Sequence, residues 1–80
     1  MNFSLAAGQS VVVGTYVIEF AGATAGVPAY NLYLVGGGLV AQFPSGARTP
    51  NWSYIYSNVL IYTTRLSTDG QTATSIVVVK

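Results

Sequence analysis

Three consecutive glycines, Gly36 to Gly38, separate two apolar runs between Tyr30 and Phe43. Glycine adopts the positive φ angles of tight hairpin turns, and β-branched or aromatic residues on both sides suit a pleated sheet. The stretch therefore predicts a β-hairpin, and we expect the rest of the chain to pack around it. A two-residue loop at the glycines predicts three cross-strand pairs on a core-facing side: Leu34–Leu39, Leu32–Ala41 and Tyr30–Phe43.

The opposite side of this hairpin is predicted to contact a partner. It mixes polar and apolar residues: Asn31, Tyr33, Val35, Val40 and Gln42. Such a face is too polar for a deep core and too apolar for an ordinary wet surface. Tyr33, Val35 and Val40 are therefore candidate partner contacts, and tyrosine is a residue type enriched at interfaces.

A second hairpin is predicted where Asp69-Gly70, a dipeptide preferred in type I′ turns, joins residues 52–66 to residues 71–79. A two-residue loop there predicts one largely apolar face with the pairs Leu66–Ala73, Tyr62–Val77 and Leu60–Val79. The other face then holds the pairs Arg65–Thr74, Thr63–Ile76 and Ile61–Val78. Because this other face is polar near the turn, the turn is expected to extend into solvent.

The remaining segments are short and punctuated by turn residues. Alternation predicts a short strand over residues 2–5, and residues 10–20 predict one longer central strand with a bulge or a close backbone approach at Gly14. Residues 21–27 and 44–51 are predicted loops because they are rich in small residues or proline. Since no apolar spacing of 3.6 occurs, no helix is expected.

The predicted fold class is all-β, with one domain over residues 1–80. We expect an antiparallel β-sandwich or barrel of about five to seven short strands. Charged residues make up 6% of the 80 residues and hydrophobic residues 51%, whereas roughly 25% of an average soluble protein is charged. Because cysteine and histidine are absent, oligomer contacts are the expected support of so small a domain.

Charge and hydropathy also argue against two classes of partner. The net charge of +1 leaves no basic patch for a nucleic acid. The uncharged stretch between Glu19 and Arg48 contains Pro28 and several glycines, and its apolar runs are much shorter than the roughly 20 residues of a spanning helix. Residues 1–5 carry no positive region typical of a secretory signal. We therefore expect cytoplasmic synthesis, without a nucleic-acid or membrane partner.

No catalytic residue, metal site or cofactor is predicted. The only two carboxylates, Glu19 and Asp69, fall in different segments, and neither histidine nor cysteine is present. No acid–base pair, activated nucleophile or metal cluster can therefore be assembled within one chain. A non-enzymatic protein is expected.

The aromatic side chains are the remaining candidates for contacts. Tyr30, Tyr54 and Tyr62 are expected in the core or at its edge, whereas Trp52 beside the proline-rich loop is a candidate partner contact. Arg48 is the only charge in that loop, and it is the candidate for reaching a neighbouring subunit.

The order of these segments resembles a known class of proteins. The run FSLAAGQSVVV from Phe3 to Val13 is followed by the glycine hairpin, an irregular loop, the late strand NVLIY from Asn58 to Tyr62 and a valine-rich end. This order is similar to that of small all-β structural proteins in the virions of tailed bacteriophages.

The resemblance implies a capsid decoration, cement or spike role without catalytic residues. It further implies a virion location, with synthesis in the host cytoplasm and contacts to other copies and to virion proteins such as the major capsid protein. The low charge favours a position embedded among neighbours. The alternatives are a receptor- or glycan-binding spike or fibre module and a self-assembling filament subunit.

Overall fold

The computed structural model describes residues 2–43 and 53–80, and in these ranges the chain forms eight strands and no helix. The strands are β1 (Asn2–Ala6), β2 (Ser10–Val13), β3 (Tyr16–Thr24), β4 (Val27–Leu34), β5 (Leu39–Phe43), β6 (Ser53–Tyr56), β7 (Val59–Leu66) and β8 (Thr72–Val79). The predicted all-β class is confirmed, with one strand more than the expected range.

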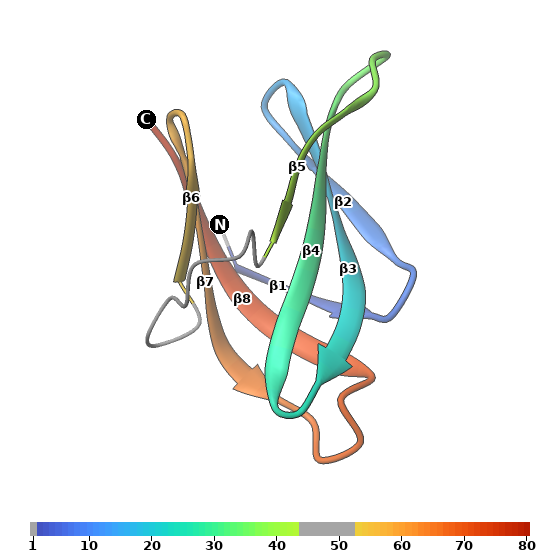
Figure 1. Cartoon of the computed structure of the whole chain (residues 1–80). Coiled ribbons are helices and arrows are strands. Elements are labelled where there is room, and N and C mark those ends of the chain that lie inside the picture. The colour runs from blue at the N-terminus through green and yellow to red at the C-terminus, as the bar shows by residue number, and fades with distance from the viewer. Residues whose placement is uncertain (1, 44–52) are drawn as a thin grey trace.

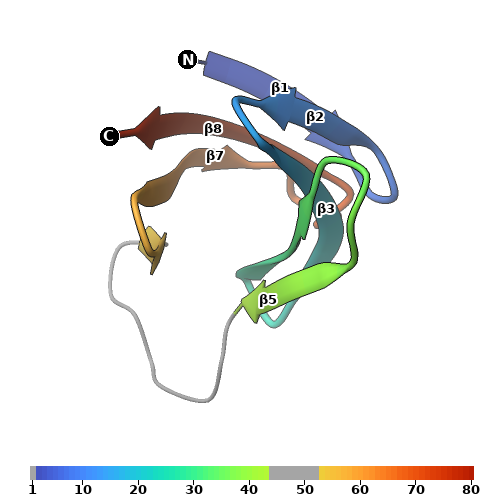
Figure 2. The ribbon, with the colours of Figure 1, turned by 90° about the horizontal axis from the view of Figure 1, so that it is seen from above.

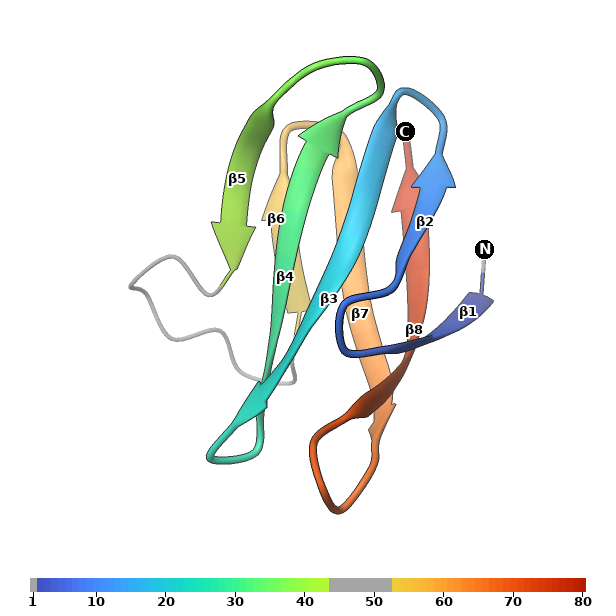
Figure 3. The same ribbon diagram turned by 90° about the vertical axis from the view of Figure 1, so that its right-hand side faces the viewer.

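Two antiparallel sheets of four strands face each other as a sandwich (Figures 1 and 3). One sheet has the order β1-β8-β7-β6 and the other the order β2-β3-β4-β5. The chain passes between sheets after β1 and again after β5, so the first strand pairs with the last. Both sheets curve around a common interior (Figure 2).

The core between the sheets is built from aliphatic residues and a connected series of aromatic rings. Ring centroids lie 5.4 Å apart for Phe20 and Tyr30, 6.0 Å for Tyr30 and Tyr54, and 5.2 Å for Tyr54 and Phe43. The rings of Phe43 and Tyr54 are stacked, and they connect the edge strands β5 and β6. The aromatic series therefore links both sheets, as tilted and offset rings of this spacing commonly do.

Buried hydroxyl groups also join the sheets. The Tyr30 hydroxyl on β4 lies 2.6 Å from Thr63 Oγ1 on β7 and 2.6 Å from Ser75 Oγ on β8. The Tyr54 hydroxyl donates a hydrogen bond of 2.6 Å to the carbonyl oxygen of Pro28. Burial raises the pKa of the Tyr30 hydroxyl, so it stays protonated and able to donate. Tyr30 and Tyr54 are core residues, as predicted.

The hairpin over residues 30–43 forms, but its register changes near the turn. Tyr30 pairs with Phe43 and Leu32 pairs with Ala41, as predicted. A bulge then pairs Tyr33 with Leu39, so the predicted Leu34–Leu39 pair is wrong. Val40 is the extra residue of β5 at this bulge, because it has no pairing partner on β4.

The bulge at Val40 also changes which way this side chain points. An extra residue in one strand disturbs the alternation of side chains. Val40 is partly buried and packs against the core, so its predicted place on the outward side is wrong.

Residues 10–20 form two strands instead of one. β2 and β3 pair through Val13 and Tyr16, so Gly14 and Thr15 are the two loop residues. Gly14 has a φ of 60°, and a glycine at the first loop position is typical of a type II′ turn. The predicted continuous strand is therefore wrong, because both of its faces are apolar and alternation does not reveal the reversal.

Residues 21–27 form strand ends and a tight turn instead of a loop. β3 continues to Thr24, and β4 begins at Val27. Ala25 and Gly26, with φ angles of 54° and 76°, form the turn between them. Two positive φ angles are characteristic of a type I′ turn, so this small-residue run forms a hairpin that was not predicted.

The predicted hairpin over residues 52–79 is correct only near its turn. Leu66 pairs with Ala73 and Arg65 with Thr74, as predicted, and a register shift follows between Thr63 and Arg65. Beyond the shift the predicted pairs are wrong, and the pairs are Thr63–Ser75, Tyr62–Ile76, Ile61–Val77, Leu60–Val78 and Val59–Val79.

The same shift exchanges the predicted faces of β7. Ile61 and Thr63 become buried, whereas Tyr62 is exposed. The predictions of Tyr62 in the core and of Thr63 on the outer face are therefore wrong. The predicted strand over residues 52–66 is also interrupted at Ser57 and Asn58, which form the turn between β6 and β7.

The Asp69-Gly70 turn differs from the prediction in type and location. Ser67 donates its backbone N–H to the Thr72 carbonyl, so the loop contains four residues and not two. Gly70 is buried, with a φ of 71°, and its carbonyl oxygen accepts a hydrogen bond from Ala23 N. The loop therefore docks on the β3–β4 hairpin of the other sheet.

Candidate docking surface

Three hairpin tips and the end of β8 lie at one end of the sandwich (Figures 1 and 3). Among the described residues, ten large hydrophobic side chains are exposed, and eight of them belong to strands or loops at this end. We call these eight the apolar end: Val12, Leu34, Val35, Leu39, Ile55, Tyr56, Val78 and Val79. The two others, Val27 and Tyr62, lie elsewhere.

Hydrogen bonds hold the tips at the apolar end together. Val35 N donates to the Thr15 carbonyl at 2.9 Å, which joins the β4–β5 tip to the β2–β3 tip. The Tyr16 hydroxyl donates a hydrogen bond of 3.3 Å to Asn58 Oδ1, and this bond joins the two sheets. Asn58 Nδ2 in turn donates to the Lys80 carbonyl at 2.7 Å. A surface whose loops are fixed in this way loses less conformational entropy on binding.

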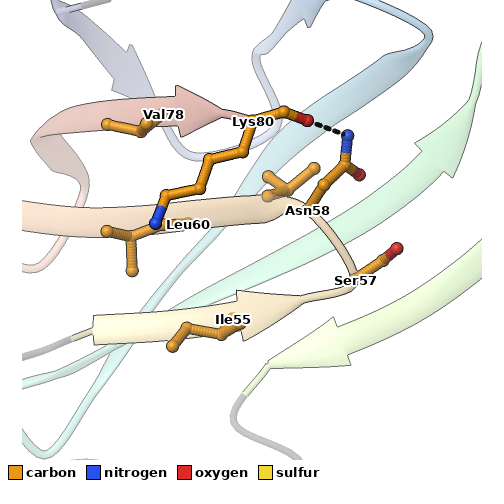
Figure 4. A pocket seen from close by; sticks show the side chains of 7 residues that line it. Ile55, Ser57, Asn58, Leu60, Val78 and Lys80 are labelled. Atoms are coloured by element: carbon orange, nitrogen blue, oxygen red, sulfur yellow. Dashed lines mark hydrogen bonds between the residues drawn. The ribbon is translucent and has the colours of Figure 1, made fainter.

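The apolar end includes a shallow hollow on the outer face of the β1-β8-β7-β6 sheet (Figure 4). Cross-strand pairing places Ile55 opposite Leu60 and Leu60 opposite Val78. The hollow has a volume of about 140 Å³, and the Lys80 side chain extends along it beside Leu60 (Figure 4). Its lining is mostly apolar, so it suits an aliphatic side chain of a partner.

The outer face of the other sheet carries a polar network. Glu19 Oε1 accepts hydrogen bonds from Asn31 Nδ2 at 3.0 Å and from the Tyr33 hydroxyl at 3.2 Å. Gln42 Nε2 donates to Asn31 Oδ1 at 3.3 Å. Two effects raise the pKa of the Tyr33 hydroxyl: partial desolvation, which is the larger, and the neighbouring Glu19 carboxylate.

The structure separates the predicted contact residues. Val35 is at the apolar end with 55% of its surface exposed, and Tyr33 lies on the outward side of β4 within the polar network. Val40 lies on neither of these two surfaces, because it packs against the core. Arg48 and Trp52 lie outside the described residues.

Several residues of the apolar end escaped the sequence-based prediction. Leu34 and Leu39 are both exposed, and the bulge in β5 replaces their expected pair with Tyr33–Leu39. Val78 was paired with Ile61, whereas it pairs with Leu60. Ile55 was assigned to one continuous strand over residues 52–66, without a turn at Ser57. The signal that identifies this turn is the Ser57-Asn58 dipeptide, since asparagine and serine favour turns.

Within ranges 2–43 and 53–80, no three metal-ligating side chains come together. The same part of the chain contains no helix long and apolar enough to cross a membrane. The buried hydroxyl cluster of Tyr30 is inaccessible to a substrate, because each of its three members is at most 1% exposed.

The comparisons with known proteins do not extend this description. No protein-family model, curated protein or solved structure matches this chain.

Proposed function

We propose that this protein is a non-catalytic structural subunit of a tailed-phage virion. Its role is that of a decoration or cement protein, which stabilises the shell through contacts with other copies of itself and with the major capsid protein. The observation that supports this proposal is the apolar end, where eight large hydrophobic side chains are exposed on connected hairpin tips and the end of β8.

Burial of the apolar end provides the binding free energy. Each Å² of apolar surface removed from water contributes roughly 25 cal/mol, so large side chains exposed together favour association. Part of that gain is offset by lost rotational and translational freedom. Repetition over a symmetric shell then converts individually weak contacts into stable attachment.

The distribution of charge favours docking through this end. Among the residues that the structure describes, Lys80 is the only charged one that lines the hollow, whereas Arg65 and Asp69 lie towards the opposite end of the sandwich. Desolvation of an apolar patch with few charges costs little free energy when it contacts another protein. The proposed orientation leaves the β7–β8 loop facing away from the shell.

The proposal is tested with purified particles. Quantitative mass spectrometry should find many copies per particle, in proportion to the shell protein. Particles lacking the protein should release their genome at a lower temperature, and adding the purified protein back should restore the release temperature. Equal thermal stability of complete and depleted particles would contradict the cement role.

A further inference from the structure

Two adjacent rows of side chains run across the outer face of the β2-β3-β4-β5 sheet. Strand register places the polar side chains in one row: Ser10, Glu19, Asn31 and Gln42. The neighbouring row, two residues along each strand, contains Val12, Val17 and Tyr33. One sheet face thus presents a polar strip beside an apolar strip that includes an aromatic ring.

The polar row retains unused hydrogen-bonding groups. Within residues 2–43 and 53–80, Glu19 Oε1 accepts two hydrogen bonds while Oε2 accepts none. In the same part of the chain, Gln42 Oε1 has no donor, and the amides of Gln42 and Asn31 each use one of their two N–H groups. Internal bonds therefore fix the side chains in place and leave further acceptors and donors for a ligand.

These groups favour a ligand rich in hydroxyl groups. A hydroxyl can donate to the Glu19 carboxylate and accept from an amide N–H at the same time. The row has a carboxylate and no cationic side chain, so an anionic ligand is disfavoured. Neighbouring strands lie about 4.8 Å apart, so Glu19, Asn31 and Gln42 span about 10 Å. An extended ligand suits this length better than a compact one.

We propose that this face binds an uncharged saccharide chain. Glu19, Asn31 and Gln42 contact its hydroxyl groups, and Val17 and Tyr33 contact its apolar C–H faces. Tyrosine suits this position because it combines an apolar ring with a polar tip. The proposed saccharide contacts lie outside the apolar end that the docking role uses, although Val12 of the apolar row belongs to that end.

Nuclear magnetic resonance titration of the whole protein tests the site directly. The probes are cellohexaose, maltohexaose and chitohexaose, each added to about 10 mM, well above a millimolar Kd. At least one probe should shift the side-chain amide signals of Asn31 and Gln42 in a saturable way. The absence of saturable shifts with all three probes overturns the proposal.

Matched substitutions separate this site from general effects. Glu19→Gln should raise the Kd by about tenfold, because a hydrogen bond to a charged group is lost. Asp69→Asn changes the net charge equally, but on a loop that belongs to the other sheet, and should leave the Kd unchanged. Equal weakening by both variants contradicts the assignment.

Self-association through this face is the competing outcome. In that case the amide signals shift with protein concentration in the absence of saccharide, and saccharide has no further effect. This result would replace the saccharide with a second copy of the chain and overturn the proposal.

Discussion

The backbone N–H of Ala23 donates a hydrogen bond of 3.0 Å to the carbonyl oxygen of Gly70 and so joins the two sheets at the end opposite the apolar end. The contact is close. A Cβ atom placed on Gly70 would lie 3.0 Å from the Ala23 carbonyl oxygen and 3.3 Å from its Cβ. A side chain at position 70 is therefore disfavoured both by the positive φ of Gly70 and by the close contact with Ala23.

We expect Gly70→Ala to lower the free energy of unfolding more than a glycine substitution without this neighbour. Gly26→Ala is the matched control, because Gly26 has a similar φ of 76° and a Cβ atom added there would meet no other atom within 4 Å. Both variants lose stability through backbone strain of about 1 kcal/mol. Gly70→Ala should lose about 1 kcal/mol more from crowding. Equal urea midpoints for the two variants would show that the contact with Ala23 relaxes freely.

Removal of the Tyr30 hydroxyl should destabilise the core. Within residues 2–43 and 53–80, Tyr30→Phe leaves the buried Thr63 and Ser75 hydroxyls with only each other, 3.2 Å apart, as partners. The expected loss is about 1 to 3 kcal/mol, measured by chemical denaturation. Adding Thr63→Val and Ser75→Ala should recover part of it, because no buried hydroxyl of this cluster then lacks a partner. An unaltered stability of Tyr30→Phe contradicts this account.

Asp69 should make stability depend on pH in the acid range. Hydrogen bonds from Ser67 Oγ and then from Gln71 N lower the pKa of its carboxyl group below the ordinary value of 3.8. Folding therefore favours the ionised form. Its contribution is present above pH 3.8 and is lost as the pH falls through the lower folded-state pKa.

Thermal melts of the parent protein and Asp69→Asn, recorded between about pH 6 and pH 2, isolate this effect. The asparagine keeps an acceptor oxygen but does not titrate. The difference in melting temperature between the two proteins should shrink below pH 3.8. A constant difference at every pH would mean that the Asp69 charge does not contribute.

Val35→Lys should weaken self-association while leaving the β-structure intact. Val35 is an exposed residue of the apolar end, so a lysine there introduces a charge that must be desolvated on contact. Val27→Lys is the control, because Val27 is an exposed valine at the opposite end. Sedimentation velocity and circular dichroism measure the two properties. A parent protein that is monomeric at micromolar concentration contradicts the expected oligomer.

Predicted cross-strand pairs are correct on one side of each register shift and wrong on the other. Leu66 and Ala73 were paired correctly, but the pair predicted for Tyr62 was wrong because a register shift intervenes. One extra residue reverses every side chain beyond it, and alternation cannot reveal this where both faces of a strand are apolar. The same limit explains the misassigned Leu34–Leu39 pair.

Two turns were missed because their residues are not distinctive. Gly14 was interpreted as a bulge, because a glycine inside an apolar run is compatible with either feature. Ala25-Gly26 forms a turn only because two long strands pair on both sides of it. For the candidate site, Val35 was placed on the second face of the hairpin and is exposed in the structure. The apolar end itself depends on three hairpin tips that meet only in three dimensions.

The pairing of β1 with β8 determines when the fold can be completed. Ser4 and Thr74 form a side-chain hydrogen bond although 70 residues separate them. Contacts so distant in sequence form slowly, because a long loop must close before they contribute. We therefore expect β1 to dock last, so that β8 exposes a free edge in the late folding intermediate. Pulse-labelling hydrogen exchange should show amides of β1 gaining protection after those of β3 and β4, and simultaneous protection would argue for a single concerted step.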